Sequence, residues 1–173
     1  HLPPDIRAVD IQPVPDSFHA RYAAHAKTYH YYLLNTRVDD PFLFDTCHRI
    51  WPALDLAAMQ AAAAKFVGTH DFSALCASGS SAAAHGDTVR TITDCTVVQS
   101  GNLFTISVTA DGYLYNMVRI LAGTLVQAGL HKRTPDSIPP LLESRDRKQA
   151  GPTLPAKGLF LERVDYPGLD AIS

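Results

Sequence analysis

Residues 111–129 (DGYLYNMVRILAGTLVQAG) constrain the fold most, because they predict one helix that is apolar on nearly every side. A helix of this kind is usually buried. Arg119, in its middle, would then be a guanidinium without water, which costs on the order of several kcal/mol unless a carboxylate faces it. The residues that recur at helical spacing are Leu114, Met117, Val118, Leu121 and Leu125. The group that faces Arg119 is therefore the central question about this chain.

The composition is that of an ordinary globular domain. The chain has 173 residues, of which 46% are hydrophobic and 18% charged, and this length suits one domain or little more. No apolar run approaches the roughly 18 residues that a membrane span needs. Cys47, Cys76 and Cys95 are odd in number and widely spaced. This spacing argues against a disulfide framework and for a reducing compartment.

The net charge of −2 argues mildly against nucleic-acid binding, because such proteins usually carry a basic excess. The distribution of charge matters more than its sum, and the positive side chains cluster in three places. These are Arg21 with Lys27, then His131, Lys132 and Arg133, and finally Arg145, Arg147 and Lys148.

The chain opens with His1 rather than Met and runs directly into HLPPDIRAVDIQPV. This opening resembles the interior of a protein. We expect a fragment or a processed chain, the alternatives being the scar of a tag or an unlisted start.

Four segments carry strand signals. Residues 27–35 (KTYHYYLLN) predict an aromatic strand with Tyr29 and Tyr31 on one face and His30 and Tyr32 on the other. Residues 90–98 and 103–110 predict a hairpin around QSGN, with Phe104, Ile106 and Val108 facing one way. Residues 158–166 predict a closing strand, and residues 4–14 a weaker edge strand.

Two further helices are expected. The first covers residues 54–68, with Asp55 as its N-cap and Gly68 at its end. Its buried stripe would be Leu56, Met59, Ala63, Phe66 and Val67. The second is shorter and begins with Thr134 as cap and Pro135 at the first position. Residues 77–88 are small and low in complexity, which predicts a mobile loop.

The element order predicts an α+β fold. It consists of one mostly antiparallel sheet with helices packed on one face, and the other face would be free to bind.

The sequence lacks the motifs that mark the most common kinds of catalytic and metal-binding site. No zinc-ligand spacing, phosphate loop, dinucleotide fingerprint or nucleophile elbow occurs in the sequence. Among the carboxylates, Asp71 (in THDFSAL) and Asp111 stand in plausible positions, and for both a turn or cap role is favoured over catalysis. Tyr31 is best explained by core packing. For Tyr29, core packing competes with base stacking, which needs an aromatic ring on an open sheet face.

Four motifs in order and spacing resemble the C-terminal half of the tRNA pseudouridine synthase A family: FHARYAAHAKTYHYY, THDFSAL, GYLYNMVRILAGTLVQAG and GPTLPAKGLFLERVDYP. The resemblance covers nearly the whole chain. It implies isomerisation of uridine to pseudouridine in the anticodon stem-loop of tRNA, without cofactor or metal, by a cytoplasmic homodimer. It also implies a long sheet built from two similar halves with the active cleft between them.

The resemblance assigns roles to five residues. Tyr29 matches the tyrosine that stacks on the target uracil and can accept the C5 proton. Arg119 matches the arginine that pairs with the catalytic aspartate. Leu159 matches an apolar residue against the base. Arg21 matches an arginine near the cleft that serves either RNA contact or structure, and Lys27 is a candidate for substrate binding. The family's catalytic aspartate lies in a G-R-T-D-A-G-type loop of the N-terminal half, and this sequence contains no such motif.

The chain is therefore expected to be the C-terminal domain of a synthase and inactive by itself. Arg119 is expected beside water, an anion or a partner chain, and the face that carries Tyr29 is expected to be unusually exposed. The alternative is a stand-alone RNA-binding or dimerisation domain without catalysis.

Overall fold

The computed structural model describes residues 1–77 and 86–168. Six strands form one sheet in the order β2-β1-β5-β4-β3, with β6 also paired to β1. All pairs are antiparallel except β1 with β2. The strands are β1 (Ala26–Asn35), β2 (His48–Ile50), β3 (Gly68–Asp71), β4 (Val89–Ser100), β5 (Leu103–Ala110) and β6 (Leu159–Asp165).

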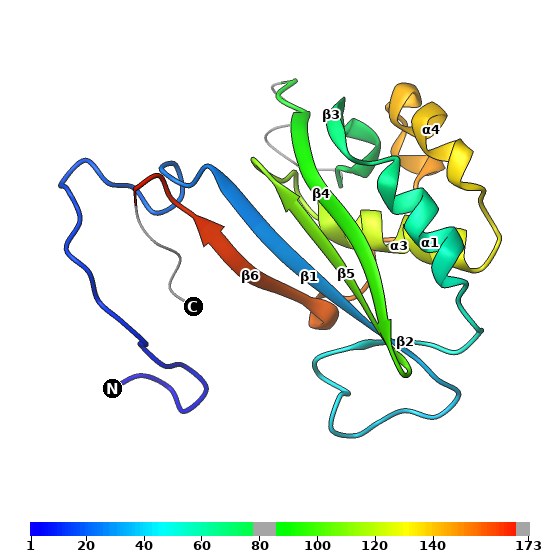
Figure 1. Cartoon of the computed structure of the whole chain (residues 1–173), viewed down its shortest axis with the longest axis horizontal. Coiled ribbons are helices and arrows are strands. Elements are labelled where there is room, and N and C mark those ends of the chain that lie inside the picture. Colours follow the sequence, from blue (N-terminus) through cyan, green and yellow to red (C-terminus); the bar gives the residue numbers. More distant parts are fainter. Residues whose placement is uncertain (78–85, 169–173) are drawn as a thin grey trace.

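Within the described residues, three helices cover one face of this sheet: α1 (Leu56–Ala64), α3 (Met117–Gly129) and α4 (Ile138–Ser144) (Figure 1). Short 3-10 turns cover Ser73–Leu75, Pro135–Ser137, Arg147–Gln149 and Ala156–Gly158. The predicted α+β class, with a mostly antiparallel sheet and helices on one face, is confirmed. No helix in the described ranges is long and apolar enough to cross a membrane.

The hairpin follows its predicted alternation. Phe104, Ile106 and Val108 are buried in β5, while the hydroxyl side chains between them are only partly covered. Asp55 caps α1 as predicted, because its side chain accepts a hydrogen bond from the Ala58 N–H at 3.1 Å. All three cysteines are free and buried. The sheet and the covering helices therefore enclose one core.

Several boundaries differ from the sequence predictions. Residues 4–14 form no strand and run clear of the sheet (Figure 1), since the prolines around them lack the N–H groups that a strand edge needs. Helix α1 ends at Ala64, before Gly68, and Val67 is 42% exposed rather than buried. The Thr134 side chain makes no cap hydrogen bond, although Pro135 does begin the turn that leads into α4. The short strands β2 and β3 were not predicted, and residues 78–85 of the expected loop lie outside the described residues.

The largest correction concerns the Arg119 helix, which begins at Met117 and not at residue 111. Asn116 stands before it in the left-handed conformation, with φ of 60°. The Tyr113 hydroxyl lies 2.8 Å from the Lys27 carbonyl oxygen and 2.7 Å from that of Val108. These contacts tie residues 112–115 to β1 and β5, so this segment lies along the sheet instead of extending the helix.

Candidate active site

Arg119, in the first turn of α3, is held by two neutral acceptors. Its Nε donates to the Leu154 carbonyl oxygen at 2.6 Å, and its Nη1 donates to Asn116 Oδ1 at 2.9 Å. The Leu154 N–H in turn donates to the Arg119 carbonyl oxygen at 3.3 Å. The guanidinium is partly exposed, which corrects the prediction of a fully buried charge. No carboxylate of the described ranges pairs with it.

This arrangement leaves donors for a further group. A guanidinium carries five N–H donors in a rigid fork, and two are used here. Because its Nε and one Nη are both hydrogen-bonded, the Arg119 guanidinium is held in one orientation. An oriented guanidinium binds a carboxylate or phosphate better than a freely moving one does.

The segment that carries Leu154 is pressed against α3. A Cβ on Gly123 would lie 2.0 Å from the Pro152 carbonyl oxygen, and a Cβ on Gly151 would lie 2.5 Å from the Gly123 carbonyl carbon. The Gly151 N–H donates to the Thr124 hydroxyl at 3.0 Å. Both glycines are therefore required by close backbone contact. This contact fixes the position along α3 at which the Leu154 carbonyl meets Arg119.

Tyr31 joins the same segment to the sheet. Its ring is fully buried, and its hydroxyl donates to the Pro155 carbonyl oxygen at 2.7 Å. Burial raises the pKa of this hydroxyl well above its ordinary value, and the nearby charge of Arg119 lowers it in part. The core role predicted for Tyr31 is confirmed, and Tyr31 also braces the segment that orients Arg119.

Tyr29 lies in β1 on the helix-covered face of the sheet, where it packs against the core. It is paired with Val108 on one side and Leu161 on the other, and directly opposed residues of antiparallel strands share a face. Its ring meets Tyr113 edge-on, with centroids 5.0 Å apart. The prediction that Tyr29 and Tyr31 share one face is confirmed, because β1 turns its odd-numbered side chains toward the core. Tyr29 nevertheless keeps part of its surface open.

Two other residues named by the resemblance share this face. Leu159 is paired with Tyr31, so it lies diagonally across from Tyr29. Lys27 is paired with the buried Ala110, which places it on the same face two residues before Tyr29. The structure therefore gathers Lys27, Tyr29 and Leu159 at one end of β1, next to the 52% exposed Leu161.

Arg21 stands apart from this group. Its backbone N–H donates to His19 Nδ1 at 3.1 Å, and its guanidinium lies 5.6 Å from the Tyr22 ring centroid. In the described ranges it makes no hydrogen bond or ion pair with Tyr29 or Arg119.

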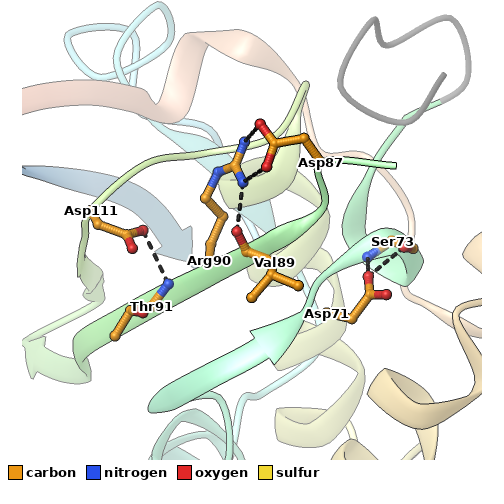
Figure 2. A network of polar contacts seen from close by, with 7 residues as sticks. All are labelled: Asp71, Ser73, Asp87, Val89, Arg90, Thr91 and Asp111. Atoms are coloured by element: carbon orange, nitrogen blue, oxygen red, sulfur yellow. Dashed lines mark hydrogen bonds and ion pairs between the residues drawn. The ribbon is translucent and has the colours of Figure 1, made fainter. Parts of the chain in front are cut away.

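The two candidate carboxylates occupy turn positions (Figure 2). Asp71 accepts hydrogen bonds from the Ser73 N–H and hydroxyl and forms an ion pair with Arg145 at 2.9 Å. Asp111 accepts from the Thr91 N–H at 3.0 Å and is exposed. The favoured cap or turn role is therefore confirmed for Asp71, whereas the Asp111 side chain bonds across to β4. No group of three metal-ligating side chains occurs in the described ranges.

The Asp71 carboxylate should make the free energy of unfolding depend on pH in the acidic range. Burial raises the pKa of its carboxyl, but the hydrogen bonds from Ser73 and Thr88 and the charge of Arg145 outweigh this and hold the pKa below its ordinary value. Because the folded-state pKa is depressed, the stabilisation is present above the unfolded-state pKa of about 3.9 and is lost as pH falls through the folded value. Asp71→Asn should lower the free energy of unfolding by about 1 kcal/mol near neutral pH. Urea titrations should show this difference shrinking toward about pH 2; a constant difference would contradict the assignment.

The sequence reasoning missed the groups that orient the site: Asn116, Leu154, Tyr113 and Leu161. Asn116 carried a usable signal, because asparagine tolerates the left-handed conformation and stands three residues before Arg119. Leu154 acts through its backbone carbonyl, which no residue type could have revealed.

The fold and the site together define an α+β domain that presents an arginine oriented by two neutral acceptors and a partly exposed tyrosine on the helix-covered face of its sheet. The chain belongs to the tRNA pseudouridine synthase family, whose model matches residues 62–167. It is similar to proteins named tRNA pseudouridine synthase A from Acetivibrio thermocellus (45% identity, 95% of this chain, 66% of the relative) and Moorella thermoacetica (45%, 95% and 66%). The protein of that name from Shouchella clausii is 44% identical over 96% of this chain and 62% of its own length. The chain thus spans slightly less than two thirds of these relatives.

Proposed function

We propose that this chain is the C-terminal domain of a tRNA pseudouridine synthase that isomerises uridine in the anticodon stem-loop of tRNA. The catalytic aspartate comes from an N-terminal domain whose motif this sequence lacks. The observation that carries the proposal is the anchoring of Arg119 by Leu154 and Asn116, two neutral acceptors that leave the positive charge uncompensated within the described ranges.

An incoming aspartate would supply the missing negative charge. Arg119 would keep that carboxylate ionised, because an adjacent cation lowers its pKa, and would aim it at the target nucleotide. The uridine must first leave its stack. The aspartate then attacks as a nucleophile or stabilises an elimination, and the bond between uracil N1 and the sugar breaks. The uracil turns, C5 bonds to the sugar, and the C5 proton is released while N1 gains one. Atoms and electrons balance without a cofactor.

The remaining residues serve the base and the RNA. Tyr29 stacks on the uracil and accepts the C5 proton, and Leu159 packs against the base from the neighbouring strand. Lys27 and Arg21 contact phosphates. The protein works in the cytoplasm as a homodimer, with tRNA as its partner and no resident metal. Leu161 is half-exposed and lies beside Tyr29 on β6, which among the described strands pairs only with β1. This exposed apolar side chain supports burial of the β6 edge of the sheet against another domain.

Tritium release from tRNA labelled at uracil C5 tests the proposal. The full-length protein should release tritium, and this chain alone should not, because it lacks the nucleophile. Release by the chain alone would mean that one of its own carboxylates performs the chemistry, and the proposal would fall. Full-length protein with Tyr29→Phe should keep tRNA binding in a filter assay but lose most of its release rate.

A further inference from the structure

An open pocket of about 540 Å³ lies at the opposite end of β1 from Tyr29. It is lined by Asn35, Thr36, Arg37, Trp51, Pro52 and Ala53. Its volume falls in the range of small-molecule sites, which is about 300–1,000 Å³. Trp51, the only tryptophan of the chain, is 57% exposed at this pocket. A large aromatic ring left open beside a hollow is a common mark of a binding surface.

The pocket wall is held in place by the Asn35 side chain. Its Nδ2 donates to the carbonyl oxygens of Ile50 (2.9 Å) and Pro52 (2.7 Å), and its Oδ1 accepts from the Leu54 N–H (3.1 Å). Asn35 thus fastens the backbone on both sides of Trp51 to the end of β1. The indole is therefore presented from a fixed backbone, which lowers the entropy lost when a ligand stacks on it.

The charge at the pocket is positive. The Arg37 guanidinium lies 5.7 Å from the Trp51 ring centroid, and Arg37 is the only charged residue of the lining. Arg49 helps to hold the backbone at Arg37, because its guanidinium donates to the Arg37 carbonyl oxygen at 3.2 Å. The same guanidinium forms an ion pair with Asp39 at 2.6 Å. An aromatic face with an adjacent guanidinium recognises a flat ring attached to an anion. An unpaired nucleotide has this chemistry, because its base stacks and its phosphate pairs with arginine.

We propose that Trp51 and Arg37 form a second RNA contact, in which an unpaired nucleotide stacks on the indole while its phosphate binds the guanidinium. This inference rests on the proposed function, because it takes the RNA substrate as the occupant. Tyr29 and Asn35 are six residues apart on β1, which corresponds to about 20 Å. The nucleotide at Trp51 is therefore a different one from the target uridine, and this contact fixes how the RNA lies across the domain.

Trp51 emission can report whether this pocket is occupied, because Trp51 is the one tryptophan in residues 1–173. Titrating the full-length protein with tRNA should quench its tryptophan emission when tryptophans outside this chain have been replaced by phenylalanine. Binding itself is followed separately with end-labelled tRNA. Trp51→Ala should raise the Kd for tRNA about tenfold, because the stacking of one base on an aromatic ring changes affinity by about this factor. Trp51→Phe should raise the Kd by less. Arg37→Gln should weaken binding and reduce the slope of log Kd against log salt by about one.

Lys65→Gln is the matched control, since it removes one positive charge from the helix side, where Lys65 pairs with Asp136 at 3.2 Å. It should leave quenching and Kd unchanged. Binding of labelled tRNA without quenching, or an unchanged Kd in Trp51→Ala, would overturn this inference and leave the proposed function intact. Emission that shifts with protein concentration in the absence of RNA would identify a second copy as the occupant and also overturn it. Failure to bind tRNA at all would remove both proposals.

Discussion

Gly123→Ala should lower the free energy of unfolding by about 3 kcal/mol or more, although alanine is the better helix former. In an exposed helix this change would stabilise by about 0.5–1 kcal/mol. Here the new methyl group would meet the Pro152 carbonyl oxygen at 2.0 Å. Backbone cannot yield as a side chain does, so α3 and the segment from Gly151 to Leu154 must separate, and overpacking of this kind is costly. Chemical denaturation measures the effect.

Gly112→Ala is the control for that measurement. A Cβ at Gly112 would meet the Arg90 side chain at 3.2 Å, and this flexible chain can move aside. Its cost should stay within about 1 kcal/mol. Equal stability of Gly123→Ala and wild type would mean that the Gly151–Leu154 segment does not press against α3, and the explanation for the placement of Arg119 would be lost.

In the proposed reaction, Arg119→Gln should lower kcat of the full-length protein by about 100-fold or more, with a much smaller change in KM. Removing one preorganised group that stabilises charge in the transition state has effects of this size. Glutamine keeps a donor for the Leu154 carbonyl, so the fold should survive. Arg119→Lys should not restore the rate, because an ammonium lacks the planar fork. Single-turnover tritium release measures the chemical step, and an unchanged rate in Arg119→Gln would contradict the assignment.

Asn116→Asp separates orientation from charge. Aspartate also tolerates the left-handed conformation at this position, so the backbone should be kept. The new carboxylate would pair with Arg119 from within the chain and repel the incoming catalytic aspartate. We expect a loss of kcat close to that of Arg119→Gln. Asn116→Gly accepts the same φ and removes only one anchor, so its loss should be clearly smaller. Similar rates for the two variants would show that Asn116 does not act through charge at Arg119.

The sequence predicted the parts of the fold that depend on periodicity. The hairpin, β1, β6 and the α+β class follow from alternation in residues such as Phe104 and Ile106, because one face of each strand must be buried. The start of α3 could not be predicted this way. Residues 112–116 match the helical period, but the Tyr113 hydroxyl binds carbonyl groups of β1 and β5, and such a tertiary contact is invisible in a local pattern.

The candidate site also has parts that the sequence predicted and parts that it could not predict. Tyr29, Lys27 and Leu159 were chosen by resemblance, and the sheet register brings them to one face. Alternation correctly put Tyr29 on the same face as Tyr31, but it gives two faces without saying which one the helices cover. Arg119 was identified by its apolar surroundings, but one of its two neutral anchors is a backbone carbonyl 35 residues later in the chain.

That last contact has a consequence for synthesis of the protein. A ribosome releases Arg119 of α3 before Leu154, which follows 35 residues later in the chain. The helix can therefore form early while its arginine still moves freely. Only after the C-terminal segment has docked across Gly123 is the guanidinium aimed, because Leu154 supplies one of its two anchors. During synthesis Arg119 therefore becomes an oriented cation only after the segment that carries Leu154 has left the ribosome.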